Sequence, residues 1–401
     1  MLDAGMEAAS GMDRSLRVAL VHDWLTGMRG GEKVLEVFCE LFPDAPLYTL
    51  LHQPGAVSRV IENREIIVSS LQKAPGAIRH YRRFLPLMPA LVEQLRPANV
   101  DLVLSSSSCV AKSVRAPAGA KHACYVHSPM RYIYDRFDDY FGKGRAGLAV
   151  RAAMNVVRRP LQRWDRATAD RVDRFAANSS FVRERVFRCF GRDSDVIAPP
   201  VDVQRFAAAR REPDDYYLIV AALVPYKMVD SAVEAFRGLD RKLIVAGKGP
   251  MLEELRAAAP PNVTLLGWVD DDAVLDLVAG CRAFLMSNVE DFGIAPVEAM
   301  AAGRPVIAFG EGGVLDSVRD LDRVDSGAFG PAATPTGLFY TDPTSTGLAA
   351  AVRRFEQHEH RFLPAETSAW TKQFDKPMFE RRIMQWLADV MDQKAARTRA
   401  A

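Results

Sequence analysis

The sequence EDFGIAPVE, at residues 290–298, predicts a tight turn that leads into a helix. Gly293 permits the turn, and Pro296 is tolerated only in the first turn of a helix. Glu290 is therefore expected in the loop and Glu298 on the helix. The amides and positive dipole end of such a helix suit a diphosphate, and nearby carboxylates can accept hydrogen bonds from sugar hydroxyls. A solvated helix with ordinary acidic residues is the alternative.

On both sides of this stretch, short apolar runs alternate with helix-period segments. The second half has runs at 216–222, 242–246, 262–266, 282–287 and 305–309, with helices near 229–237 and 251–259. The first half has runs at 17–22, 100–105, 121–126 and 174–178, with a helix over 32–41. This alternation predicts an α/β fold with parallel sheets covered on both faces.

The length of 401 residues is ample for two domains. Between the halves lies APPVDVQRF, residues 198–206, whose paired prolines fit neither a helix interior nor a central strand. We expect a loose tail over 1–13, a first domain over 14–198 and a second over 199–375. A terminal helix over 376–401 is expected to pack back on the first domain.

Composition and charge narrow the function classes. The net charge of +2 gives no general attraction to nucleic acid, and five widely spaced cysteines favour a reducing cytosol over a disulfide framework. We expect a cytoplasmic chain, because no signal peptide or membrane span is evident. Residues 142–174, however, carry nine cations against three anions. That segment predicts either a solvated face or peripheral binding to an anionic membrane, on the inner face of the plasma membrane.

Several stretches together resemble glycosyltransferase family 4, which has the GT-B fold. They are HDWLTGMRGGEKV from 22, YVHSPMRY from 125, NSSFVRERV from 178, PPVD from 199, LVPYK from 223, EDFGIAPVE from 290 and GEGG from 310. The resemblance implies two Rossmann-like domains that face each other across a cleft. It is closest to the bacterial group that builds O-antigens and exopolysaccharides, often mannosyltransferases.

The resemblance also implies roles for individual residues. Lys227 matches the lysine that contacts the donor phosphate, and Glu290 matches the glutamate that holds donor-sugar hydroxyls. His127 matches a histidine close to the reacting sugar, although a buried structural histidine is the alternative. The remaining implied donor contacts are Glu298 to the ribose, the amides of Phe292, Gly293 and Ile294 to the diphosphate, Gly312 and Gly313 beside the nucleotide, and Gly30 and Gly31 near the phosphates or the acceptor.

One position departs from the family pattern. The family usually places an arginine a few residues before the phosphate lysine, where this chain has Ala222. Half of the cationic clamp is therefore missing. Either Lys248 substitutes, or turnover is weak or lost.

The resemblance implies transfer with retention of configuration, no metal and no cofactor. The expected donor is a nucleotide diphosphate sugar, GDP-mannose favoured, and the expected acceptor is a glycan or a lipid-linked molecule. A degenerate member that binds without turnover, and a sugar-nucleotide epimerase, are the alternatives. We interpret Asp270–Asp272 as a helix cap and not as a metal site. Ser105–Ser108 follows a strand, but the sequence identifies no base for it.

Overall fold

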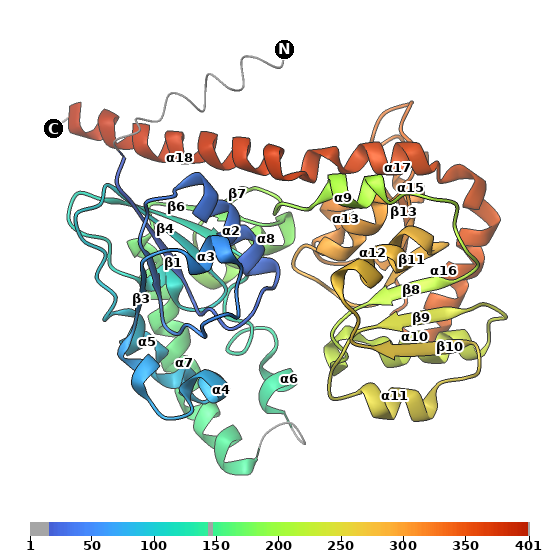
Figure 1. Ribbon diagram of the computed structural model, residues 1–401, viewed down its shortest axis with the longest axis horizontal. Helices are drawn as coiled ribbons and strands as arrows, with labels where there is room; N and C mark the ends of the chain where they lie inside the picture. Colours follow the sequence, from blue (N-terminus) through green and yellow to red (C-terminus); the bar gives the residue numbers. More distant parts are fainter. Residues whose placement is uncertain (1–15, 143–146, 400–401) are drawn as a thin grey trace. The chain divides into compact units, whose positions relative to one another are not determined.

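The structure is a computed structural model that describes residues 16–142 and 147–399, without the side chains of 82, 83 and 393–399 (Figure 1). The described chain forms two compact units. The first contains the described residues up to Pro199 and those from Phe379 onward, and the second is Pro200–Met378. The tail expected over 1–13 lies outside the described residues.

The first unit is built on a parallel seven-stranded sheet in the order β3-β2-β1-β4-β5-β6-β7. Its strands are β1 (Val18–His22), β2 (Leu47–Thr49), β3 (Ile66–Val68), β4 (Leu102–Ser107), β5 (Lys121–Val126), β6 (Arg174–Ala177) and β7 (Asp195–Val196). The four longer strands were predicted from their apolar runs. The other three were missed, because runs of two or three residues have no measurable periodicity.

Helices cover this sheet and connect its strands. They are α2 (Gly30–Leu41), α3 (Arg59–Glu62), α4 (Ala77–His80), α5 (Met88–Val92), α6 (Phe137–Phe141), α7 (Leu148–Thr168) and α8 (Ser180–Phe190), with 3-10 turns η1 (Ser70–Lys73), η2 (Tyr81–Leu87), η3 (Ala111–Ser113) and η4 (Ala169–Arg171). An ion pair between two buried groups, Lys112 and Asp165 at 2.9 Å, fixes α7 against η3.

The second unit repeats the design with the parallel order β10-β9-β8-β11-β12-β13. Its strands are β8 (Tyr217–Val220), β9 (Leu243–Ala246), β10 (Val263–Gly267), β11 (Ala283–Met286), β12 (Val306–Phe309) and β13 (Gly337–Tyr340). Its helices are α9 (Val203–Ala208), α10 (Val229–Arg237), α11 (Leu252–Ala258), α12 (Asp271–Gly280), α13 (Ile294–Ala301), α14 (Val314–Ser317), α15 (Leu321–Asp325), α16 (Ser345–His358) and α17 (Pro364–Trp370), with 3-10 turns η5 (Pro225–Lys227), η6 (Glu359–Arg361) and η7 (Thr371–Phe374).

The prediction of two parallel α/β sheets is therefore confirmed. One detail of the linker prediction was wrong, because α9 begins at Val203, inside residues 198–206. The side chain of Asp202 accepts a hydrogen bond from the Arg205 amide and so caps this helix. The apolar residues of α9, Val203 and Phe206, are buried.

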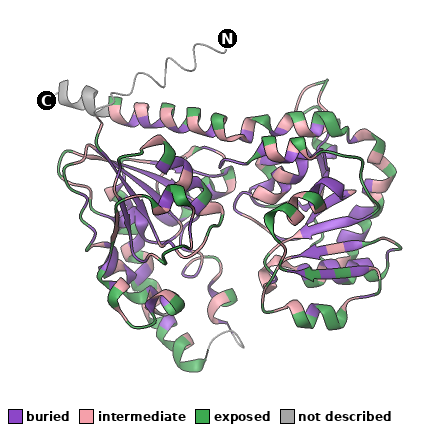
Figure 2. Ribbon diagram, in the orientation of Figure 1, coloured by how far each residue is buried: buried purple, intermediate pink, exposed green. Residues whose placement is uncertain are grey.

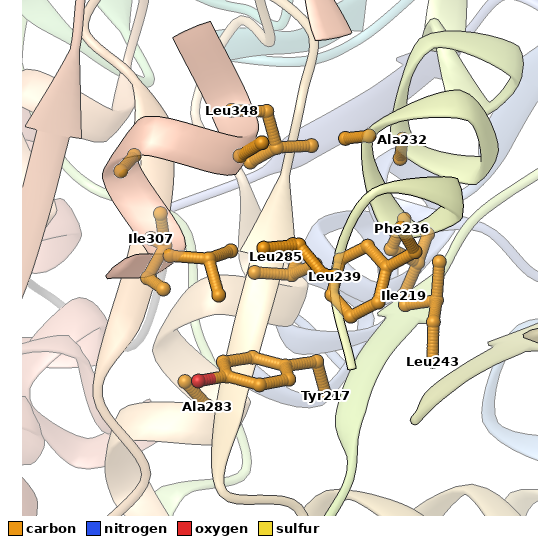
Figure 3. Packing of buried hydrophobic residues seen from close by; sticks show 14 of the residues in the cluster. Tyr217, Ile219, Ala232, Phe236, Leu239, Leu243, Ala283, Leu285, Ile307 and Leu348 are labelled. Atoms are coloured by element: carbon orange, nitrogen blue, oxygen red, sulfur yellow. The ribbon is translucent and has the colours of Figure 1, made fainter. Parts of the chain in front are cut away.

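The core of the second unit lies between the sheet and the helix pair α10 and α16. Figure 3 shows Phe236 of α10 and Leu348 of α16 packed with Leu285 of β11 and Ile307 of β12. Tyr217 closes this cluster, with its ring centroid 5.5 Å from that of Phe236. Strands that are buried on both faces explain the nearly continuous apolar runs in the sequence.

The last helix, α18 (Lys376–Arg399), alternates between buried and exposed residues along its described side chains (Figure 2). Phe379 is 2% exposed, and its ring packs on Phe38 of α2 and Tyr125 of β5, with centroids 6.0 and 5.8 Å apart. The indole N–H of Trp386 donates to Asp195 at 2.9 Å. The helix therefore completes the core of the first unit.

We predict that Phe379→Ala destabilises the first unit by about 3–5 kcal/mol, the usual cost of removing a buried aromatic ring. Urea titration followed by hydrogen exchange of the β1 and β4 amides measures this. Arg382→Ala, an exposed position on the same helix, is the control and should change stability by less than about 0.5 kcal/mol. Equal protection in the two variants would contradict the role given to α18.

Candidate functional site

In the second unit, the neighbouring strands β8 and β11 send their connections to opposite sides of the sheet. Ligands of such sheets bind at the carboxyl ends of the strands where the order reverses. β8 leads into the 3-10 turn that carries Lys227, and β11 leads into the loop that carries Glu290. The hydroxyl of Ser287 donates to the carbonyls of Lys227 and Met228, at 3.3 and 3.1 Å. This contact ties the two loops together.

The structure brings Lys227 and Glu290 together as an ion pair, although 62 residues separate them. Their side chains are 17% and 21% exposed, so solvent reaches the pair but screens it only partly. The side-chain amide of Asn288 also donates to Glu290, at 3.1 Å. The ammonium of Lys227 and the carboxylate of Glu290 are thus held side by side where the strand order reverses, between β8 and β11.

The stretch from Phe292 to Glu298 forms the turn and helix that its sequence predicts. Gly293 caps α13 with a φ of 88°, a left-handed value that favours glycine. Pro296 is the third residue of the helix, and Glu298 follows within it, half-buried. The first amides of a helix, including that of Ile294, lack intrahelical acceptors. Phe292 is buried, its ring 5.8 Å from that of Phe374, so its side chain serves packing.

Gly312 and Gly313 lie directly beneath the Glu290 loop. A Cβ on Gly312 would sit 2.5 Å from the Glu290 carbonyl oxygen, and one on Gly313 would sit 2.2 Å from that of Asp291. The Gly313 amide donates to the Glu290 carbonyl at 2.9 Å. Their lack of side chains is therefore required for the loop to adopt this position.

Lys248 lies in the loop after β9, and its carbonyl accepts a hydrogen bond from the Leu223 amide at 3.0 Å. This bond places the backbone of Lys248 beside the segment that contains Ala222, which is exposed. The Lys248 ammonium lies 5.8 Å from the centroid of the Trp268 ring. The backbone of Lys248 therefore lies close to Ala222 in the structure, and its ammonium lies near the Trp268 ring.

The aspartate cluster has the predicted capping role. Asp270 is the N-cap of α12, and its carboxylate accepts a hydrogen bond from the Ala273 amide at 2.8 Å. Asp272 pairs instead with Arg205, at 2.8 Å.

In the first unit, His127 follows β5, and the reversal of strand order lies between β1 and β4. The hydroxyl oxygen of Ser106 lies 2.8 Å from Nε2 of His127 and 3.1 Å from Nδ1 of His22. Nε2 of His22 in turn faces a carboxylate oxygen of Glu32 at 3.8 Å. Glu32, His22, Ser106 and His127 thus form a continuous polar chain.

Gly30 and Gly31 open α2 above this chain. A Cβ on Gly31 would lie 3.6 Å from Nε2 of His127 and 3.7 Å from Cε1 of His22. These are ordinary van der Waals distances, so the start of α2 lies against both imidazoles.

Burial controls the charge of His127. Burial, together with the neighbouring His22, lowers the pKa of His127 to about 3, so its ring is uncharged near neutral pH. Burial also opposes ionisation of Glu32, but the hydrogen bond and charge of His22 outweigh it and lower the pKa of Glu32.

No base was predicted near Ser105–Ser108, but the structure places histidines beside two of these hydroxyls. Ser106 contacts two histidines, and the Ser105 hydroxyl lies 2.8 Å from Nε2 of His122. His22, Glu32 and Ser106 were missed as site residues. Because β1 and β4 are neighbouring parallel strands, the polar residues at their carboxyl ends could have suggested this meeting.

Other features lie away from these residues. A cavity of about 500 Å³ in the first unit, lined by β7 and α18, contains none of the site residues predicted from the sequence. All five cysteines are buried free thiols. Among the described residues, no helix is both long and apolar enough to cross a membrane.

Two protein families match successive parts of the chain. Glycosyltransferase Family 4 matches residues 37–205, and Glycosyl transferases group 1 matches residues 201–367. A curated relative is the GDP-mannose-dependent alpha-(1-6)-phosphatidylinositol monomannoside mannosyltransferase of Mycobacterium tuberculosis. It is 34% identical over 185 residues, which cover 38% of this chain and 48% of the relative. The chain thus spans about half the length of the curated relatives that it matches first.

Solved structures share the fold over nearly the whole chain. Sucrose-phosphate synthase from Thermosynechococcus elongatus has a TM-score of 0.67 at 16% identity, covering 94% of this chain and all of that one. Anabaena HepE in complex with UDP has a TM-score of 0.63 at 17% identity, covering 93% and 100%. The chain therefore carries a Glycosyltransferase Family 4 domain followed by a Glycosyl transferases group 1 domain, and it shares the GT-B fold.

Proposed function

We propose that this chain is a retaining hexosyltransferase that takes its sugar from a nucleotide diphosphate donor. The observation that carries the proposal is the pairing of Lys227 with Glu290 at the switch point of the second unit, beside the start of α13. A cation suits the diphosphate, and a carboxylate suits sugar hydroxyls. The acceptor is a glycan or a lipid-linked molecule of bacterial surface polysaccharide synthesis.

In the proposed reaction, the bond between the anomeric carbon and the phosphate oxygen breaks while a bond to the acceptor oxygen forms. The acceptor proton passes to the leaving phosphate oxygen, so no protein base is needed. Lys227 and the first amides of α13 stabilise the negative charge that develops on the diphosphate. Glu298 is assigned to the ribose and His127 to the reacting sugar. No metal ion takes part in the proposed step.

Mannose is the favoured sugar, with GDP as its nucleotide. Support comes from the mycobacterial relative, whose name specifies GDP-mannose. The HepE structure contains UDP, so a uridine donor is the alternative. Thermal shift with GDP, UDP, ADP and their sugars separates these, because the tighter ligand raises the melting temperature more.

A second candidate function is nucleotide-sugar binding without efficient turnover. Ala222 favours it, because the expected second cation is absent from this exposed position a few residues before Lys227. Binding without transfer, in the presence of donor and acceptor, would support this candidate.

We predict that Glu290→Ala lowers kcat/KM by about a hundredfold or more, because the sugar loses a contact that strengthens in the transition state. Binding of the nucleotide diphosphate alone should persist, since the variant also removes the carboxylate that faces Lys227. Transfer assays and thermal shift measure the two effects. Glu253→Ala, which removes an exposed carboxylate on α11, is the control. Near-normal transfer by folded Glu290→Ala would contradict the assignment.

A further prediction separates the two explanations of Ala222. If no cation replaces the arginine, Ala222→Arg should raise kcat/KM about tenfold, the effect of one charge-assisted hydrogen bond. If Lys248 replaces it, Ala222→Arg should change little, and Lys248→Ala should be nearly as damaging as Lys227→Ala. Lys242→Ala, an exposed lysine just before β9, is the control. If neither Ala222→Arg nor Lys248→Ala alters turnover, this account of the phosphate site is wrong.

We also propose that the first unit binds an anionic membrane surface through α7. Six exposed residues follow one face of this helix at three- and four-residue spacing. They are apolar toward its start and basic toward its end: Leu148, Ala152, Val156, Arg159, Arg163 and Arg166. Leu148 and Val156 are 87% and 75% exposed. Apolar and basic residues along one helix face suit an anionic bilayer.

Other cations of residues 142–174 bind groups within the first unit, so the proposed membrane surface contains fewer cations than the sequence predicts. Arg158 donates to the carbonyls of Ile133 and Tyr134, and Arg174 pairs with Asp195. Lys143 and Arg145 lie outside the described residues.

The double variant Arg159→Glu/Arg163→Glu should weaken binding to anionic vesicles at low salt by at least about thirtyfold, because loss of the two arginines alone removes about 1 kcal/mol each. Wild-type binding should also fall steeply as salt rises. Vesicle sedimentation measures both effects, with Arg353→Glu on α16 as the control. Equal binding to neutral and anionic vesicles, or none to either, would leave α7 as a solvated face.

A further inference from the structure

In the polar chain of the first unit, which consists of Glu32, His22, Ser106 and His127, the hydroxyl of Ser106 lies between two imidazoles. Ser106 Oγ lies within hydrogen-bond distance of both rings and is 1% exposed, and His22 is 4% exposed. A hydroxyl has one hydrogen, so it can donate to only one of the two rings at a time. Towards the other ring it must act as the acceptor.

This restriction couples the protons of the two histidines. When His22 is neutral with its hydrogen on Nε2, towards Glu32, its bare Nδ1 accepts the Ser106 hydrogen. The Ser106 oxygen then accepts from Nε2–H of His127, and Nδ1 of His127 is left bare. When His22 carries two protons, its Nδ1–H donates to Ser106, and the Ser106 hydrogen turns to Nε2 of His127. The proton of His127 must then reside on Nδ1.

The protons balance along this chain. A proton that arrives at Nδ1 of His127 is matched by transfer of the Nε2 proton to Ser106 and of the Ser106 proton to His22. The positive charge therefore comes to rest on His22, facing Glu32, and not on His127. The lowered pKa of His127 agrees with this direction, because that ring resists holding the charge itself.

We propose that His22, Ser106 and Glu32 are positioning residues that set which ring nitrogen of His127 carries its proton. Nδ1 of His127 has no hydrogen-bond partner among the described protein atoms. Through this nitrogen the enzyme would present either an acceptor or a donor to its sugar substrate, according to the protonation of His22. This inference rests on the proposed function only for the sugar contact assigned to His127.

Other charged groups face the chain and contribute to its titration. Asp23 lies beside His22, Arg29 beside Glu32, and Arg131 acts on His127. The Arg29 amide also donates to Glu32, at 3.1 Å, and fixes that carboxylate at the start of α2. Asp23 is itself held by four backbone amides, from Ser108 to Ala111.

The test is two-bond ¹H–¹⁵N spectroscopy of the histidine rings in the full chain, with His127→Asn used to assign the His127 signals among the seven histidines. As the pH is lowered from about 8 to 5, wild-type His127 should change from the Nε2–H to the Nδ1–H tautomer without becoming charged. Glu32→Gln should move this change to lower pH, because the carboxylate faces the His22 ring at 3.8 Å.

Ser106→Ala should abolish the tautomer change at His127. Ser105→Ala is the matched control, since the neighbouring hydroxyl contacts His122 instead and its loss should alter only the His122 signals. The proposal is overturned if wild-type His127 keeps one tautomer over this pH range, or if Ser106→Ala behaves like the wild type. The spectra need neither donor nor acceptor, so failure of the proposed transfer would be seen separately, in the transfer assay.

Discussion

The parallel order of each sheet is the constraint on which the rest of the structure depends. When strand order reverses between two neighbouring strands, their connections leave on opposite faces, and the loops at the carboxyl ends remain uncovered. In the first unit this position holds His22, Ser106 and His127, and in the second it holds Lys227 and Glu290. Every polar group that the proposed chemistry needs comes from one of these two strand edges or from the helix that follows.

Close packing supports each polar group there. Gly312 and Gly313 let the β12 loop pass under the Glu290 loop, and Ser287 joins that loop to Lys227. In the first unit, the start of α2 at Gly31 lies against the imidazoles of His22 and His127. Side chains at Gly312 and Gly313 would overlap the backbone of the Glu290 loop, so these two glycines act through steric fit as well as through any contact with phosphate.

Much of the fold could be predicted from local pattern, because strands of four or more apolar residues and helices with clear periodicity carry their own signal. The turn and helix at residues 290–298 followed from Gly293 and Pro296 alone. Strands of two or three residues, such as β2 and β7, could not be found this way, because their pairing partners and not their own sequence define them.

The residues of the candidate site likewise differ in whether local sequence could predict them. The residues of the second unit lie in one recognisable motif and in LVPYK. His22 and Ser106 meet only because the two strands pair in a register that sets His22 opposite Ser106. The alternation of side chains along a strand predicts which face of the sheet a residue occupies, but not which residue of the neighbouring strand lies opposite it. Tertiary register therefore separates what the sequence predicted from what it missed.

The return of α18 to the first unit has a consequence for how the chain is made. Phe379, Ile383 and Trp386 belong to the same core as Phe38 and Tyr125, more than 250 residues earlier. On the ribosome, where domains generally fold in order of synthesis, the first unit would have to wait with an apolar groove uncovered while the second is translated. At about 5–20 residues per second this delay is on the order of ten seconds or more. The order of synthesis thus favours early completion of the second unit, which is continuous in sequence, and leaves the first unit with exposed apolar surface for longer.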